Sequence, residues 1–209
     1  MSLLNILPLP RRTGSIYFHG SRKYNKIALT FDDCPSEDTS KILNLLDKEG
    51  IKACFFIQGN LGIKRRKIIR RIIKEGHDLG NHTFSHKSSY FKSKKYIKRE
   101  LQRVDKLYQS SLVRPPYLHI GMNFYSVCKE LDKKIIACDV VSDDWKLKGI
   151  DYCVNNILNN VKPGSIINLH DYITGVGRNK YLINILKRVV PELKKRGYSF
   201  VKISDILQQ

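Results

Sequence analysis

The chain has 209 residues, 42% of them hydrophobic, and its 38 Lys and Arg residues outnumber its 19 Asp and Glu residues to give a net charge of +19. This length and apolar content predict one domain with a sizeable core, and the absence of an apolar run of about 18 residues argues against a membrane-spanning helix. The five cysteines are widely spaced and odd in number, which argues against a disulfide framework and favours a reducing compartment.

The N-terminal segment MSLLNILPLPRR is a poor signal peptide, because its apolar stretch is short, contains Pro8 and Pro10 and precedes its arginines. We therefore expect a cytoplasmic protein, in which residues 1–25 form an N-terminal extension that packs on the domain. The positive charge predicts attraction to acidic lipid headgroups, phosphate-bearing glycans or nucleic acid, although a Lys-rich composition alone gives the same charge. Nucleic acid is not an expected partner, since only the charge supports it.

Strand-like apolar runs and helix-like amphipathic segments alternate along the rest of the chain. We expect strands at 26–31, 52–57, 133–141, 164–171 and 198–203, with another ending at the prolines of 112–117 and a short segment at 77–82. The expected helices cover 38–49, 64–76, 94–108, 122–134, 151–161 and 180–196. This alternation predicts a parallel sheet with helices outside, and about seven strands favour a closed or nearly closed α/β barrel.

The expected helix at 64–76 is the most basic part of the chain. Ile68, Ile69, Ile72 and Ile73 mark one face, and the basic residues occupy the other. We interpret it as an outer helix with a solvated face. The alternative is a surface that lies on an anionic membrane.

Polar side chains follow the predicted strand ends. In an α/β barrel the carboxyl ends of the strands share one face, and that face carries the chemistry. The residues concerned are Asp32–Asp33, Asn81–His82, Arg114, Asp143–Asp144 and His170–Asp171.

Two histidines and an aspartate suggest a metal site on this face. His82 and His86 are four residues apart, and on a helical turn both imidazoles would face the same way. Together with a strand-end aspartate they form a His-His-Asp set that suits a divalent metal. Of the adjacent Asp32 and Asp33, one can bind the metal, and the other can take a proton from the water that the metal activates.

At this point the sequence resembles the polysaccharide deacetylases that share the NodB homology domain, carbohydrate esterase family 4. Order and spacing of the motifs fit from about residue 26 to residue 207, and the resemblance implies a single-domain distorted (β/α)7 barrel over 26–207. The motifs are TFDDCP at 30–35, HTFSH at 82–86, RPPY at 114–117, Asp144–Trp145 and NLHD at 168–171.

The resemblance implies a role for each motif residue. Asp33, His82 and His86 would bind Zn²⁺, or a similar ion such as Co²⁺. Asp32 would be the general base, and Arg114 would pair with Asp32 and orient it. A surface arginine is the alternative for Arg114.

The remaining motif residues would handle the substrate. The backbone N–H of Tyr117 would help to hold the oxyanion. His170 would protonate the leaving amine, unless it is merely a core histidine. Trp145 would wall the acetyl pocket, or else lie in the core.

Four positions depart from the family pattern. Cys34 and Leu118 each replace a glycine, so the thiol could act as an extra ligand and the leucine could narrow the groove. Asn168 stands where a leucine usually lines the acetyl pocket, and Leu169 would then have to cover it. At Val141 the family commonly has an aspartate that partners the catalytic histidine.

The loss of that aspartate puts the general acid in question. Asp139 lies two residues before Val141, on the same strand face, and is the candidate replacement partner for His170.

The function implied is that of a metal-dependent hydrolase that removes an N-acetyl group from a sugar in a glycan or glycan precursor. A cytoplasmic location favours a lipid-linked or nucleotide-linked sugar precursor, with peripheral contact to anionic membrane. The four departures support an alternative, a weakened or inactive member that binds glycan or metal without turnover.

Overall fold

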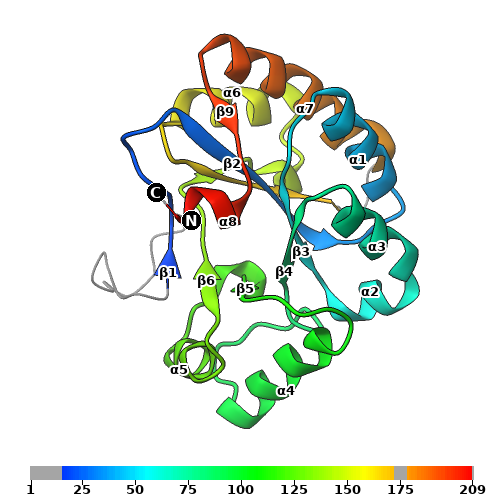
Figure 1. Ribbon diagram of the computed structural model, residues 1–209, viewed down its shortest axis with the longest axis vertical. Helices are drawn as coiled ribbons and strands as arrows, with labels where there is room; N and C mark the ends of the chain where they lie inside the picture. Colours follow the sequence, from blue (N-terminus) through cyan, green and yellow to red (C-terminus); the bar gives the residue numbers. More distant parts are fainter. Residues whose placement is uncertain (1–15, 172–177, 209) are drawn as a thin grey trace.

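The computed structural model describes residues 16–171 and 178–208 (Figure 1). Its strands form one curled sheet in the order β1-β6-β5-β4-β3-β2-β8-β7, and β9 pairs with β2. Every pairing between these strands is parallel. The predicted single-domain α/β barrel is confirmed. The strands are β1 (Ile16–Tyr17), β2 (Lys26–Cys34), β3 (Cys54–Ile57), β4 (Asp78–Asn81), β5 (Leu112–Val113), β6 (Lys134–Ile136), β7 (Val140–Val141), β8 (Ile166–His170) and β9 (Ser199–Phe200).

The helices α1 to α7 lie around the outside of the curled sheet (Figure 1), whereas the short α8 packs on its inner side. The helices are α1 (Thr39–Lys48), α2 (Gly59–Lys64), α3 (Arg66–Lys74), α4 (Lys94–Asp105), α5 (Met122–Glu130), α6 (Ile150–Asn160), α7 (Arg178–Lys195) and α8 (Ile203–Ile206), with 3-10 turns at η1 (Pro116–Leu118) and η2 (Asp144–Lys146).

Three elements differ from expectation. The predicted helix 64–76 is broken at Arg65, whose φ of −128° and ψ of 41° separate α2 from α3. The predicted strand 133–141 is two short strands, β6 and β7, that pair with different partners across the sheet. The last predicted strand is short, and α8 follows it.

Strand alternation divides the core into two layers. Ile27, Leu29 and Phe31 of β2 pack in the cluster that also contains residues of the outer helices. Ala28 belongs to a second cluster, which includes Ile203 and Ile206 of α8. Thr30 and Asp32 continue the face of Ala28, because side chains of a strand alternate. Buried polar groups therefore collect at the carboxyl end of the barrel interior.

Part of the predicted N-terminal extension belongs to the sheet. Residues 1–15 lie outside the described residues, but β1 pairs with β6. Arg22 forms a 2.7 Å ion pair with Asp139. All five cysteines are free and buried. Within the part of the chain that the structure describes, no helix is both long enough and apolar enough to cross a bilayer.

Candidate active site

Asp32 and Asp33 are neighbours in sequence, yet both contribute to one site. Asp32 keeps the inward orientation of β2 and is in register with His170 on β8. Regular alternation would send Asp33 to the helix side, but its φ of 58° is left-handed, and the register of β2 with β3 shifts at this point. Such an irregularity re-aims a side chain, and Asp33 lies 2.9 Å from His86.

Asp33, His82 and His86 bring three donor atoms together at the ends of β2 and β4. These atoms all lie within 4.8 Å of one another. Asp33 Oδ1 is 2.9 Å from His86 Nε2 and 3.7 Å from His82 Nε2. It is buried, and no hydrogen-bond donor of the described residues is aimed at it. Two imidazoles and a carboxylate suit a divalent transition metal, so the residues present fit the predicted ion.

The two histidines do not lie on a helical turn, and that expectation is wrong. Residues 82–86 form an irregular loop after β4. Thr83 and His86 have left-handed φ angles of 62° and 55°, and the centroids of the two imidazole rings are 5.1 Å apart. The spacing of four residues brings the rings together through a tight loop instead of a helix.

Buried polar side chains support this loop. Asn81 accepts a hydrogen bond from Thr83 N at 3.0 Å and donates one to Leu101 O at 3.0 Å. Glu100, buried on α4, accepts from Ser85 N at 2.8 Å and from Ser85 Oγ at 2.6 Å. The sequence did not point to Glu100, because one glutamate on a charged helix has no signature that distinguishes it from a solvated one.

The carbonyl of Arg114 orients His82. His82 Nδ1 lies 2.8 Å from that oxygen and donates its proton there, which leaves the lone pair of Nε2 facing Asp33. Burial lowers the pKa of His82 and so favours the neutral, metal-binding form. Burial raises the pKa of Asp33, but His86 and His82 outweigh this and lower it overall.

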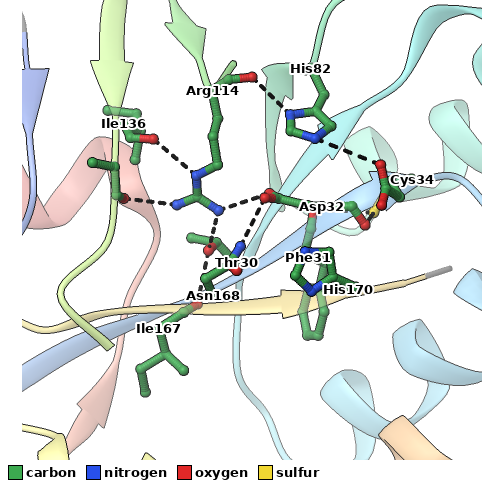
Figure 2. A network of polar contacts seen from close by, with 12 residues as sticks. Thr30, Phe31, Asp32, Cys34, His82, Arg114, Ile136, Ile167, Asn168 and His170 are labelled. Carbon is green, nitrogen blue, oxygen red and sulfur yellow. Dashed lines mark hydrogen bonds and ion pairs between the residues drawn. The ribbon is translucent and has the colours of Figure 1, made fainter. Parts of the chain in front are cut away.

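Arg114 is fully buried, so the surface-arginine alternative is wrong. Its Nη1 donates to Asp32 Oδ1 at 2.8 Å and to Thr30 Oγ1 at 2.7 Å. Its Nε and Nη2 donate to the carbonyls of Ile136 and Ala137, both at 2.9 Å. Figure 2 shows the guanidinium held between β6 and the Asp32 carboxylate. The predicted Arg114–Asp32 contact is therefore present and rigidly supported.

The second oxygen of Asp32 meets an unexpected partner. Asn168 Nδ2 donates to Asp32 Oδ2 at 2.8 Å (Figure 2). Asp32 is thus held at both oxygens. Burial raises its pKa, but Arg114, His82 and His170 outweigh burial and lower it overall. Asp32 is ionised at neutral pH.

His170 is paired with Asp144. His170 Nδ1 lies 2.7 Å from Asp144 Oδ1, and the backbone N–H of His170 donates to Asp144 Oδ2 at 2.8 Å. Asp144 is completely buried. Burial lowers the pKa of His170, but the carboxylates of Asp144, Asp32 and Asp33 together outweigh burial and raise it to about 9, with Asp144 contributing most. The imidazole is therefore protonated at neutral pH.

The expectation that Asp139 replaces the missing carboxylate at Val141 is wrong. Asp139 accepts hydrogen bonds from Arg22 at 2.7 Å, from Ser165 Oγ at 2.9 Å and from Ile166 N at 2.8 Å. It lies at the amino end of β8 and binds the segment that follows β1. Asp144 reaches His170 because η2 turns back toward the end of β8.

Trp145 and Tyr117 flank the two ends of the site. Trp145 is 40% exposed and lies edge-on to His170, with 5.2 Å between ring centroids. It is therefore at the site and not in the core. The ring of Tyr117 lies edge-on to His86 at 5.0 Å. Tyr117 and Leu118 both have left-handed φ angles, of 60° and 54°, which explains why a glycine suits the position of Leu118. The Leu118 side chain packs against the interior cluster.

Leu169 does not cover the acetyl pocket, and that expectation is wrong. It is completely buried in the helix-side cluster, because strand alternation sends it to the face opposite Asn168 and His170. Cys34 is also completely buried in this cluster, and its thiol contacts Phe31 O at 3.3 Å. Burial raises the pKa of Cys34 well above its usual value, so the thiol is protonated and is not placed as an extra ligand.

Asp171 directly follows β8, at the strand end that the sequence indicates, but its hydrogen-bond partners were not predicted. It accepts hydrogen bonds from Ser36 N at 2.9 Å, Ser36 Oγ at 2.8 Å and Thr39 Oγ1. It therefore ties the end of β8 to the turn before α1, next to the two site aspartates.

Comparison with known proteins identifies the class to which this fold and site belong. A family model described as polysaccharide deacetylase matches residues 19–136. The match covers more than half of the chain, and the chain belongs to this family.

Similar proteins include peptidoglycan deacetylases. A peptidoglycan-N-acetylglucosamine deacetylase of Bacillus cereus is 34% identical over 197 residues, 90% of this chain and 71% of that protein. The crystal structure of the Bc1960 peptidoglycan N-acetylglucosamine deacetylase matches with a TM-score of 0.86 at 32% identity, covering 93% and 94% of the two chains. The structure of BA3943, a pseudoenzyme of the CE4 family from Bacillus anthracis, matches with a TM-score of 0.84 at 20% identity and covers 93% of this chain and 69% of that one. At this identity the match shows only that the two proteins share a fold.

Proposed function

We propose that this protein is a metal-dependent carbohydrate N-deacetylase, which hydrolyses the acetamide of an N-acetylated sugar to an amine and acetate. One observation carries the proposal. The donor cluster of Asp33, His82 and His86 lies beside Asp32 and His170. Asp32 is ionised and accepts a hydrogen bond at each carboxylate oxygen, and His170 is protonated. A carboxylate base and an imidazolium acid at one site meet the needs of amide hydrolysis.

Asp33, His82 and His86 would hold the metal ion, with Zn²⁺ favoured by the donor set and Co²⁺ as a substitute. When bound, such an ion supplies Lewis acidity toward water and the amide carbonyl. The carbonyl of Arg114 keeps His82 in the tautomer that leaves Nε2 free.

Asp32 takes a proton from the attacking water as the water oxygen bonds to the amide carbon. Arg114 keeps the Asp32 carboxylate in one orientation through a 2.8 Å bond and favours its ionised form. The N–H of Tyr117 would donate to the oxygen that becomes negative.

His170 gives its proton to the amide nitrogen as the C–N bond breaks. An amine leaves poorly unless it is protonated, so the raised pKa of His170 serves this step. Asp144 holds Nδ1 at 2.7 Å and so directs Nε2 to the substrate. Trp145, beside this ring, would form the wall against the acetyl methyl group.

Similarity to peptidoglycan-N-acetylglucosamine deacetylases supports an N-acetylglucosamine-containing glycan, or its lipid-linked or nucleotide-linked precursor, as the substrate. The cytoplasmic location remains a prediction, which fractionation of cells that make the protein would test.

The test is acetate release. Purified protein, stripped of metal and reloaded with Zn²⁺ or Co²⁺, is offered peptidoglycan, N-acetylglucosamine oligomers and lipid- or nucleotide-linked sugars. Asp32→Asn is the matched control. We expect metal-dependent release from the native protein and none from the control. No release from any substrate with either metal would contradict the proposal.

The second candidate is a family member that binds glycan or metal without turnover. The contact of Asn168 with Asp32 Oδ2 favours it, because an oxygen that already accepts a hydrogen bond is a weaker proton acceptor. Asn168→Leu removes this donor at similar volume. If the second candidate is correct, native protein is inactive and Asn168→Leu gains activity.

The two faces of β8 provide the control for this test. Leu169→Ala creates a cavity in the helix-side cluster and should cost about 2–5 kcal/mol of unfolding free energy, with metal binding kept. Asn168→Leu should lower the unfolding free energy less than Leu169→Ala does, and it should change the rate of acetate release more than Leu169→Ala does. Denaturant titration and acetate release on both variants check this prediction. Equal effects on activity would contradict the assignment of the two faces.

A further inference from the structure

Asn168 lies one side-chain layer deeper in the barrel than His170. Both belong to the inward face of β8, and residues two apart in a strand are separated by about 6.6 Å along it. His170 ends the strand, and Asn168 lies below it with 4% exposure. The register partners of Asn168 are Thr30 on β2 and Val141 on β7. Asn168 therefore belongs to the floor of the candidate site.

The partner of the Asn168 amide fixes its orientation. The ionised carboxylate of Asp32 can only accept hydrogen bonds, so the NH₂ end of the amide faces it, and Nδ2 donates to Asp32 Oδ2 at 2.8 Å (Figure 2). One N–H and the carbonyl oxygen Oδ1 are left. Among the described residues, neither of these two groups has a hydrogen-bond partner. The floor thus offers one donor and one acceptor that the fold itself does not use.

The geometry of the reaction places the acyl tail of the substrate against this floor. The attacking water must contact both Asp32 and the amide carbon, and the amide nitrogen must contact His170, so the amide lies across these two side chains. The barrel interior beneath them is filled by buried side chains, which leaves no room for a sugar ring. The sugar therefore stays at the open end, and only the tail of the acyl group is small enough to point down toward Asn168.

An acetyl tail would leave the two polar groups of Asn168 without partners. A methyl group neither donates nor accepts a hydrogen bond, and an unpaired buried polar group is unfavourable. A hydroxyl group can both donate to Oδ1 and accept from Nδ2. A site built around such polar groups discriminates strongly against an analogue that lacks the hydroxyl. The floor therefore suits a hydroxyl-bearing acyl tail better than an acetyl tail.

We propose that Asn168 is a specificity-determining residue for the acyl group, and that the preferred amide carries a hydroxyl on its acyl tail, of which N-glycolyl is the smallest. The proposal rests on the proposed function for the reaction and changes only the acyl group. The water oxygen bonds to the carbonyl carbon and its proton passes to Asp32. The C–N bond then breaks, the amine leaves with the proton of His170, and glycolate is released in place of acetate.

The test compares acyl groups of equal size. Metal-loaded protein is assayed on glucosamine oligomers that carry N-glycolyl, N-propionyl or N-acetyl groups, and glycolyl differs from propionyl only by a hydroxyl in place of a methyl. We expect kcat/KM for N-glycolyl to exceed that for each of the other two by about tenfold or more in the native protein. Asn168→Leu should remove or reverse this preference.

Asn123→Leu is the matched control. Asn123 is exposed on α5, and its Nδ2 donates to Lys92 O, so this variant should keep the native preference. Equal rates on N-glycolyl and N-propionyl in the native protein would overturn the proposal, as would a faster rate on N-acetyl. A preference that survives in Asn168→Leu would also overturn it, because the hydroxyl would then be recognised elsewhere, for example at the metal ion.

A binding measurement separates this proposal from the proposed function. Calorimetry measures N-glycolyl and N-propionyl oligomers on metal-loaded His170→Ala protein, which lacks the acid, with and without Asn168→Leu. Tighter binding of the N-glycolyl oligomer that disappears with Asn168→Leu supports the role of Asn168, even if the native protein hydrolyses no amide. Equal binding of the two oligomers, or none, together with equal rates overturns the proposal, even if the native protein releases acetate.

Discussion

The two halves of the candidate site are built by different means. The metal half combines Asp33, at the irregular end of β2, with His82 and His86 of the loop after β4, and Asp33 and His86 both have left-handed φ angles. Glu100 and the carbonyl of Arg114 support the histidine loop through hydrogen bonds. The acid half is the regular end of β8, where one buried carboxylate, Asp144, makes both contacts to His170.

The two halves also differ in how far the sequence predicts their contacts. The candidate metal ligands His82 and His86 are four residues apart in the motif HTFSH, but Asp33, in TFDDCP, lies 49 residues before His82. It joins them because β2 and β4 end on the same edge of the parallel sheet, so the identity of the motif residues indicates this cluster. The partner of His170 lies 26 residues away from it along the chain. Its identity depends on the backbone of η2, which is preceded by Asp143 with a left-handed φ of 61°.

The largest expected effect separates the two aspartates. Asp33→Ala removes one of the three candidate metal ligands and should lose both metal and activity. Asp32→Asn keeps the shape but only one acceptor oxygen, so it can accept from Arg114 or from Asn168 and not from both. It should still retain metal, because Asp32 is not among the candidate ligands, while kcat falls by about 10²–10⁴-fold or more. Metal content by elemental analysis, with acetate release, checks this. Equal metal loss in both variants would contradict the division of roles.

The acid half should show its dependence on one carboxylate through pH. His170, with a pKa of about 9, stays protonated through neutral pH, so activity should fall as pH rises through about 9. Asp144→Asn removes the largest contributions that raise this pKa and leaves those of Asp32 and Asp33, so the fall in activity should move to lower pH. At pH 8 the variant should therefore lose more kcat than it loses at pH 6.

Asp139→Asn is the matched control for that experiment. Asp139 holds Arg22 and the start of β8, so this change should lower unfolding free energy without moving the alkaline limb. The raised pKa of His170 also predicts how the free energy of unfolding depends on pH. Because His170 binds its proton more tightly when folded, its contribution is complete below pH 6.5 and disappears as pH rises through about 9. An alkaline limb that moves with Asp139 instead of Asp144 would contradict the pairing.

The metal half should be sensitive to its supporting layer. Glu100→Gln weakens two hydrogen bonds to Ser85 and so loosens the loop that carries both histidines. Changes in such outer residues typically cost 10–100-fold in metal affinity. Metal competition titration measures it, with Glu130→Gln as control, since Glu130 is 53% exposed and pairs only with Lys98 in the described residues. Equal affinity in both variants would show that Glu100 is not needed.

Local periodicity predicted most of the helices and the parallel sheet, and barrel topology predicted the face where the polar strand ends meet, but the break between α2 and α3 and the short α8 were not predicted. Sequence patterns could not predict that β6 and β7 pair near opposite edges of the sheet, since periodicity does not determine which strand pairs with which. In the site, Arg114 and Asp32 were expected to meet, and they do. The orientations of Asp144 and Asn168 were missed because they depend on backbone angles and register.

The smallest expected effect lies outside the site, on the exposed face of α2 and α3. This basic surface is defined as Lys64, Arg66, Lys67, Arg70 and Lys74. Within the described residues, no ion pair engages these five cations, whereas neighbouring Arg65 and Arg71 pair with Glu37 and Glu75. Ile63 and Ile73 are 46% and 53% exposed beside them. Cations next to exposed apolar side chains suit an anionic lipid surface.

Peripheral binding to anionic membrane is therefore the last prediction. Each surface cation adds up to about 1 kcal/mol, so Lys67→Gln with Arg70→Gln should weaken binding to acidic vesicles, measured by co-sedimentation, by up to about 30-fold. Binding should also fall as salt rises, because exposed charges are screened. Lys187→Gln with Lys195→Gln on α7 is the charge-matched control. If both double variants lose binding equally, net charge and not this surface is responsible, and absence of binding at low salt would rule out the membrane contact.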